Sequence, residues 1–108
     1  MPIIVNVTVK TAGSDHTLDI DPDPVQIAVG VRGPIQWKIT NPPSDKWKFR
    51  RNGVDITDPG TEFDDPRGGG SRVFTWNNHH TTAGTYKYAV RVEQDGLNVD
   101  EDPTIMNN

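Results

Sequence analysis

The sequence predicts an all-β fold, an antiparallel β-sandwich or barrel of about seven or eight short strands. Apolar residues recur at every second position along most of the chain, which is the period of strands with one buried face. Clusters of glycine and proline separate these runs, and both residues end strands, because proline cannot donate to a ladder and glycine adopts turn conformations easily. The length of 108 residues, without a linker, predicts one domain over residues 1–108.

The alternation places the strands in order along the chain. They are expected at residues 3–9, 18–20, 25–29, 35–39, 46–50, 72–77, 84–93 and 104–106. The residues expected to face the core are Ile3, Val5, Val7, Val9, Leu18, Ile20, Val25, Ile27, Val29, Ile35, Trp37, Ile39, Trp47, Phe49, Tyr86, Tyr88, Val90 and Val92. No window has the period of an amphipathic helix, and one helical turn is left open within residues 55–66.

Residues 52–71 form the irregular part of the sequence, rich in acidic residues and glycine. Long loops in compact domains are either mobile connectors or binding surfaces, and the sequence leaves both interpretations open. If this segment binds a partner, the candidate residues are Asp58, Glu62, Asp64, Asp65 and Arg67. Its glycine run, residues 68–70, lacks the lysine and the strand–helix context of a phosphate-binding loop.

Positive charge is concentrated between residues 32 and 51, although the whole chain has a net charge of −4. The cations of this segment are Arg32, Lys38, Lys46, Lys48, Arg50 and Arg51, and Asp45 alone opposes them. Alternation turns Trp47 and Phe49 away from the cations, so they are expected in the core and not as platforms for stacked bases. With the acidic net charge, nucleic acid is therefore an unfavoured partner. The segment is interpreted as a solvated face, or as a surface for an acidic protein or a second copy, with Lys46, Lys48 and Arg50 as candidate contacts.

The sequence contains few residues or motifs that indicate a metal site or a catalytic site. The chain has no cysteine, which excludes disulfides, thiolate metal sites and a cysteine nucleophile. His79 and His80 are adjacent; they point apart in an extended chain and converge only in a turn, so two exposed turn histidines are the preferred interpretation and a metal site the weaker one. The acidic residues at 19, 21 and 23 are spaced like the first three calcium ligands of an EF-hand loop, but Pro24 stands where that loop requires glycine. Neither a nucleophile elbow nor a zinc-protease motif is present, so the chain is not expected to be an enzyme and no cofactor is expected.

The segment Gly84-Thr-Tyr-Lys-Tyr-Ala-Val90 resembles the last long strand of the cupredoxins, where the copper-binding cysteine follows the second aromatic residue. On this resemblance Val90 stands at the cysteine position, and residues 104–106 are the short closing strand. Residues 35–41 resemble the strand before a copper-binding histidine, but residues 46–48 are Lys, Trp and Lys. The resemblance therefore implies the fold without copper electron transfer.

An immunoglobulin-like sandwich is the second choice. Thr82-Ala-Gly-Thr-Tyr86 resembles the tyrosine corner of that fold, Trp37 corresponds to its buried tryptophan, and Tyr88 stands where a cysteine would follow. Both resemblances imply two packed antiparallel sheets in Greek-key order.

The expected function is that of a metal-free binding or interaction module, which uses residues 52–71 and the basic surface of residues 32–51. Its partner is expected to be an unidentified protein or a second copy of the chain. The alternative is a divergent cupredoxin-like protein that binds Cu, Zn or Ca through His79, His80 and acidic loops. Neither a run of about 18 apolar residues nor a secretory signal is present, so a cytoplasmic location without a membrane is expected.

Overall fold

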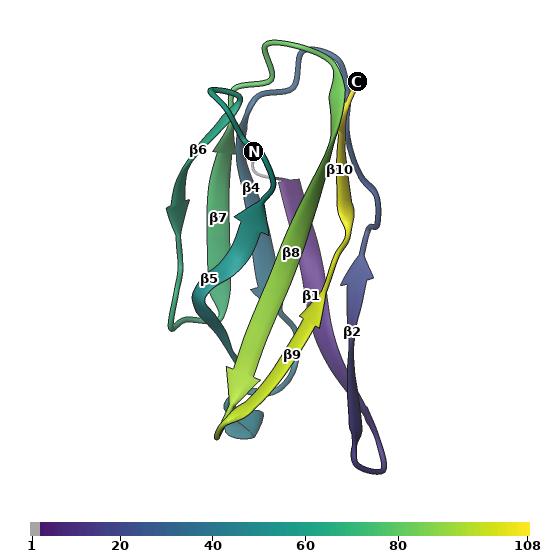
Figure 1. Ribbon diagram of the computed structural model, residues 1–108, viewed down its shortest axis with the longest axis vertical. Coiled ribbons are helices and arrows are strands. Elements are labelled where there is room, and N and C mark those ends of the chain that lie inside the picture. Colours follow the sequence, from purple (N-terminus) through teal and green to yellow (C-terminus); the bar gives the residue numbers. More distant parts are fainter. Residues whose placement is uncertain (1–2) are drawn as a thin grey trace.

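Two five-stranded sheets face each other in the computed structural model, which describes residues 3–108 (Figure 1). The first sheet has the order β2-β1-β4-β7-β6. Its strands are β1 (Ile3–Ala12), β2 (Asp15–Asp21), β4 (Gly33–Ile39), β6 (Phe63–Arg67) and β7 (Val73–Asn78). The second sheet has the order β3-β10-β8-β5, and β9 also pairs with β8. Its strands are β3 (Val25–Ile27), β5 (Lys48–Ile56), β8 (Gly84–Gln94), β9 (Leu97–Glu101) and β10 (Thr104–Asn107).

The all-β class is confirmed, but the purely antiparallel arrangement is wrong. β1 runs parallel to β4, and β3 runs parallel to β10. The chain leaves the first sheet after β2, adds β3 to the second sheet and returns as β4. Alternation of apolar residues determines which side chains face the core, but it carries no information about the direction of the neighbouring strand. Both sheets are therefore mixed.

Two strands, β6 and β9, are additional to those predicted. Each has a single buried apolar residue, Phe63 in β6 and Val99 in β9, so neither shows the alternation that identifies a half-buried strand. The helical turn also lies elsewhere than expected. It is the 3₁₀ turn η1 (Pro43–Asp45), whereas residues 55–66 contain no helix. Within residues 3–108, no helix is long and apolar enough to cross a membrane.

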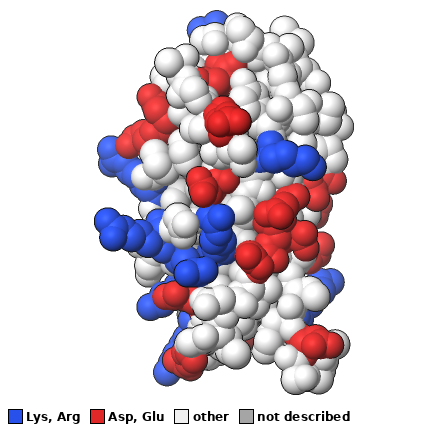
Figure 2. Space-filling view, in the orientation of Figure 1, with Lys and Arg blue, Asp and Glu red and all other residues white. Residues whose placement is uncertain are grey.

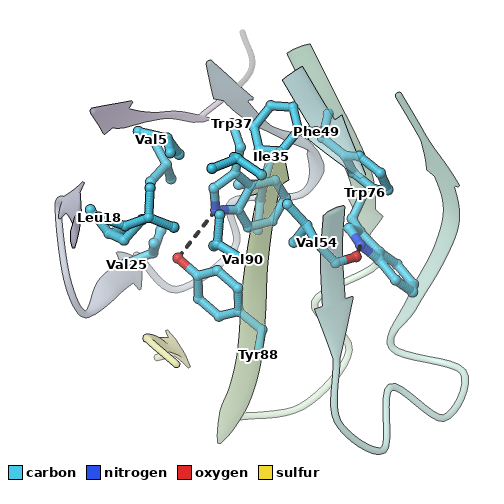
Figure 3. Close-up of a cluster of buried hydrophobic side chains, with 14 of the residues drawn as sticks. Val5, Leu18, Val25, Ile35, Trp37, Phe49, Val54, Trp76, Tyr88 and Val90 are labelled. Carbon is cyan, nitrogen blue, oxygen red and sulfur yellow. Dashed lines mark hydrogen bonds between the residues drawn. The ribbon is translucent and has the colours of Figure 1, made fainter. Parts of the chain in front are cut away.

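The space between the sheets is filled by the residues that alternation places inward. Val5, Ile35 and Trp37 of the first sheet face Tyr88 and Val90 of the second across the core (Figure 3). The predicted inward positions Trp47 and Phe49 are also buried. The exception is Val29, which lies beyond the end of β3 and is 81% exposed.

A hydrogen bond between Trp37 and Tyr88 is one of those that join the two sheets inside the core. The Trp37 indole Nε1 donates to the Tyr88 hydroxyl at 3.1 Å (Figure 3), and the two rings meet edge to face with centroids 5.4 Å apart. Burial raises the pKa of the Tyr88 hydroxyl well above its ordinary value. The hydroxyl therefore remains protonated and available as an acceptor.

Tyr88→Phe is expected to destabilise the fold by about 1–2 kcal/mol, because it leaves the buried Trp37 N–H without an acceptor. Tyr86→Phe is the matched control, since Tyr86 lies two residues away in β8 and is only partly buried. The control is expected to change the unfolding free energy by less than about 0.5 kcal/mol. Urea denaturation followed by tryptophan fluorescence measures both values, and equal losses would contradict a role for the inter-sheet hydrogen bond.

Candidate functional site

Half of residues 52–71 are strand, which corrects the prediction of an irregular loop. β5 continues to Ile56, and β6 occupies Phe63–Arg67. The segment lacked apolar alternation because β5 contains a large bulge: Phe49 pairs with Val92, and the next pair is Val54 with Val90. Residues 50–53 therefore have no backbone pairing partners on β8 and form a bulge at the edge of the sheet.

The glycine run of residues 68–70 covers the free edge of β5. The Phe49 N–H donates to the Ser71 carbonyl, and the Gly70 N–H donates to the Phe49 carbonyl, both at 2.8 Å. This contact requires a very close approach, since a Cβ on Gly69 would lie 2.8 Å from the Arg51 Cα. The glycines thus have a structural role, which is to fix the position of the β5 bulge.

A pocket of about 260 Å³ opens between the β5 bulge, β6 and the glycine run. Its apolar side chains are Trp76, Phe74, Val54 and Pro66, and its polar ones are Arg51, Asn52 and Asp55; Gly68 and Gly69 complete the lining. We call it the Trp76 pocket. The indole Nε1 of Trp76 donates to the Val54 carbonyl at 2.7 Å, so the ring is held in place and its orientation does not depend on a ligand.

The basic side chains of β5 form the β5 surface, which we define as Lys48, Arg50 and Arg51; of these, Arg51 also lines the pocket. Lys48 and Arg50 approach the same carboxylate, Glu93, at 3.7 and 3.9 Å. Arg51 is exposed, and within the described part of the chain no carboxylate pairs with it. Two of the three cations therefore share one carboxylate, that of Glu93. Figure 2 shows most of the basic side chains of this face on the β5 side, interspersed with acidic ones, and a group of acidic side chains on the side of β9 and β10.

Arg32 and Lys38 do not join this surface, which corrects the prediction of one basic face over residues 32–51. Arg32 precedes β4, Lys38 projects from β4 in the other sheet, and Lys46 ends η1 with a φ of 62°. Alternation identified the exposed side of each strand but not the sheet to which the strand belongs. Lys48 and Arg50 are thus the predicted basic contacts that lie together.

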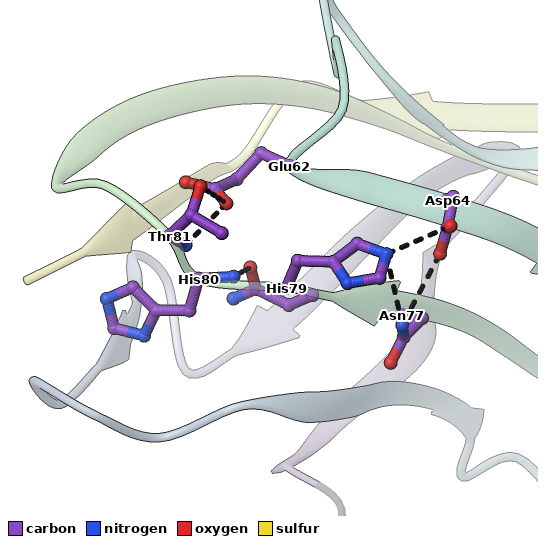
Figure 4. A network of polar contacts seen from close by, with 7 residues as sticks. Glu62, Asp64, Asn77, His79, His80 and Thr81 are labelled. Atoms are coloured by element: carbon purple, nitrogen blue, oxygen red, sulfur yellow. Dashed lines mark hydrogen bonds and ion pairs between the residues drawn. The ribbon is translucent and has the colours of Figure 1, made fainter.

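Glu62, a predicted binding residue, is instead a buried connection between two turns. Its carboxylate accepts four hydrogen bonds of 2.6–2.9 Å, from the backbone N–H and the hydroxyl of both Thr81 and Thr82; Figure 4 shows the contact with Thr81. Burial raises the pKa of Glu62, but these hydrogen bonds outweigh it and lower the pKa from 4.5 to about 2. The carboxylate therefore joins the turn before β6 to the turn before β8 and has little capacity left for a partner.

The other predicted acidic residues also have local partners. Asp64 Oδ2 lies 2.9 Å from His79 Nε2, and this hydrogen bond, with a smaller effect of Asn77, lowers the pKa of Asp64. Asp65 pairs with Arg67 at 2.8 Å. Asp58 is in the turn after β5 with a φ of 50°. None of these residues lines the Trp76 pocket.

The two histidines point to opposite sides (Figure 4). His79 is half-exposed beside Asp64, but His80 is 7% exposed, so the interpretation of two exposed turn histidines is wrong for His80. Its ring nitrogens lie 2.6 and 2.7 Å from the main-chain oxygens of Val31 and Asn108, where it closes one end of the fold. Within residues 3–108, no three His, Asp or Glu side chains are grouped as ligands for a metal ion.

Sequence reasoning missed the Trp76 pocket and a buried amide pair. Asn78 and Asn107 donate to each other's side-chain oxygens at 2.8 and 3.1 Å, which connects β7 to β10. Both follow apolar residues at every second position, Phe74 and Trp76 in one strand and Ile105 in the other. Extending the alternation by one step would have placed both amides in the interior. The pocket had no such signal, because its walls come from strands distant in sequence.

Comparison with known proteins gives no family for this chain. No protein-family model matches it, and no curated protein matches it either. Its function is therefore inferred from the pocket and the charges around it.

Proposed function

We propose that this chain is an interaction module that binds an acidic protein segment on the β5 surface and holds an apolar side chain of that segment in the Trp76 pocket. The observation that carries this proposal is that Arg51 belongs both to the basic β5 surface and to the rim of a pocket whose other walls include the apolar side chains of Trp76 and Phe74. Concave apolar sites with a few polar groups at the rim are the usual form of binding sites.

The charges of the β5 surface favour an acidic partner. Lys48, Arg50 and Arg51 outnumber Glu93 by three to one, and the two ion pairs with Glu93 are longer than 3.5 Å and exposed. Exposed ion pairs contribute only about 0–1 kcal/mol, so a carboxylate of the partner can replace Glu93 at small cost. Such charges mainly increase the rate of association and select the partner.

The pocket favours an apolar side chain at the centre of that segment. A volume of about 260 Å³ accommodates one side chain of the size of leucine or phenylalanine. Complete burial of such a side chain contributes about 1.5–3 kcal/mol. This contribution adds to the electrostatic one and, unlike it, persists at high salt.

A pair of synthetic peptides tests this function. One has a leucine flanked by aspartates, and the other has serine in place of the leucine. In calorimetry at about 50 mM salt, we expect the leucine peptide to bind at least about tenfold more tightly than the serine peptide. Arg51→Glu is expected to weaken this binding by about tenfold or more, whereas Lys38→Glu, the same charge change on the other sheet, is not. Equal affinities for the two peptides, or equal effects of the two substitutions, would overturn the proposal.

We also propose that the fold is cupredoxin-like. Support comes from β8, which contains Gly84 to Val90, and from β10 as a short strand beside it. Val90 at the cysteine position is completely buried among apolar side chains. The chain departs from the resemblance after Val90, since β8 continues to Gln94 and returns as β9. An experimental structure superposed on cupredoxin and immunoglobulin domains tests this assignment.

A further inference from the structure

Strand β2 forms a free edge of the first sheet. It is the outermost strand in the order β2-β1-β4-β7-β6, and Figure 1 shows it at the border of the molecule. All seven of its residues, Asp15–Asp21, pair in register with β1. A strand with one neighbour leaves the backbone groups of every second residue unpaired, and these groups can receive another strand.

The register identifies the residues that carry the unpaired backbone groups. The Asn41 side chain bonds both the N–H and the carbonyl of Val9, so these two groups point away from β2. Residues directly opposite each other in an antiparallel pair have the same orientation, and Leu18 of β2 opposes Val9. The N–H and carbonyl of Leu18 therefore point outward from the free edge. By alternation, those of His16 and Ile20 point the same way.

The other sheet edges are short, irregular or covered. β6 contains Pro66 and a shift of register, the glycine run of residues 68–70 covers β5, and β3 and β9 have three and five residues. β2 contains neither proline, glycine, lysine nor a bulge, which are the usual features that prevent strand addition. Within residues 3–108, β2 is therefore the longest regular edge that is left uncovered.

The exposed side chains of β2 determine the charge of a strand that fits this edge. Asp15, Asp19 and Asp21 lie together on its solvent face. Asp19 pairs with Lys10 at 3.8 Å, and no cation within residues 3–108 pairs with the other two. A second copy of β2 would bring aspartates against aspartates, which is unfavourable. A strand with lysine or arginine at every second position instead places cations beside them.

We propose that β2 binds an extended basic segment of another protein, which adds antiparallel to the first sheet as a further strand. The backbone of the segment pairs with the outward groups of His16, Leu18 and Ile20, and its cations lie beside the three aspartates. Apolar side chains between the cations pack next to Leu18 and Ile20, which are 7% and 8% exposed at this edge. In strand addition, main-chain hydrogen bonds give the affinity and alternate side chains give the specificity. The site is on the other sheet from the β5 surface, so it does not rest on the proposed function.

A short synthetic peptide of alternating lysine and valine tests the proposal by calorimetry. At about 50 mM salt we expect it to bind the full chain at least about tenfold more tightly than a peptide with glutamate in place of lysine. In an antiparallel added strand, the valine nitrogens face β2 and the lysine nitrogens face away. Methylation of the valine nitrogens is therefore expected to weaken binding by at least about tenfold, whereas methylation of the lysine nitrogens changes it by less than about twofold.

Hydrogen exchange and two charge substitutions locate the site. The backbone amides of His16, Leu18 and Ile20 are expected to exchange at least about tenfold more slowly when the lysine peptide is saturating. Asp19→Lys is expected to weaken the binding of this peptide by at least about tenfold. Asp64→Lys is the matched control, since it makes the same charge change on β6 at the opposite edge of the same sheet, and it is expected to change the affinity by less than about twofold.

Several results would overturn the proposal. These are no binding of the lysine peptide, equal affinities of the two methylated peptides, or equal effects of the two substitutions. Slow exchange of the three outward amides in the free chain at high protein concentration would mean that a second copy occupies the edge, and it would also overturn the proposal. The acidic leucine peptide tests the proposed function separately, because it binds the β5 surface and not β2.

Discussion

Gly68→Ala is expected to destabilise the chain by about 3 kcal/mol or more, which places it among the severe single substitutions. The Gly68 φ is +132°, a region that residues with a side chain rarely adopt. An added Cβ would also collide with the Val73 carbonyl oxygen and would lie 2.6 Å from the Phe74 Cα. Both neighbours are backbone atoms of β7, so the collision is relieved only if the turn moves away from the strand.

Gly70→Ala is the matched control within the same run. Gly70 also has a positive φ, +84°, but no atom lies within 4 Å of its added Cβ. We therefore expect a loss of only about 1–2 kcal/mol, from the backbone conformation alone. Urea denaturation of both variants measures the difference, and equal losses would show that contact with β7 does not restrict residue 68.

The interior of the fold was predictable because it depends on a local pattern. Val5, Trp37, Phe49 and Val90 were expected to face the core from alternation, and all four are buried. Strand direction was not predictable in the same way. The pairing of β1 with β4 depends on where the chain crosses between the sheets. That crossing is a property of the whole topology and cannot be read from a short stretch of sequence.

The site was less predictable than the fold, because the sequence does not reveal which charges have partners inside the molecule. Glu62 looks like one of several exposed acids until Thr81 and Thr82 are brought to it by the folding of β7 and β8. The structure divides the predicted binding residues into three groups. Lys48 and Arg50 belong to the β5 surface, and Lys46 and Asp58 lie in turns. Asp64, Asp65 and Arg67 form local ion pairs, and Glu62 accepts local hydrogen bonds. The Trp76 pocket was missed because the alternation in residues 72–77 gives Trp76 the pattern of an ordinary core residue.

Glu62→Gln is expected to destabilise the chain by about 2–3 kcal/mol at neutral pH. The glutamine amide cannot accept all four hydrogen bonds, because its NH₂ group is a donor and would face the N–H and O–H donors of a threonine. The wild-type carboxyl has a pKa of about 2 when folded against 4.5 ordinarily. A lowered folded pKa means that the unfolded chain binds the proton first as the pH falls. The stabilisation by Glu62 is therefore complete above pH 4.5 and is lost progressively between pH 4.5 and 2.

Free energies of unfolding measured between about pH 7 and about pH 2 test this dependence on the protonation of Glu62. The wild-type curve should fall through the acid range, and the curve of Glu62→Gln should be flatter and converge with it at low pH. Glu101→Gln, at an exposed carboxylate, should stay within about 0.5 kcal/mol of the wild type throughout. Parallel curves for the wild type and Glu62→Gln would contradict the assignment. In that case the contact between Glu62 and the two threonines would hold the turns together without a charge-dependent contribution to stability.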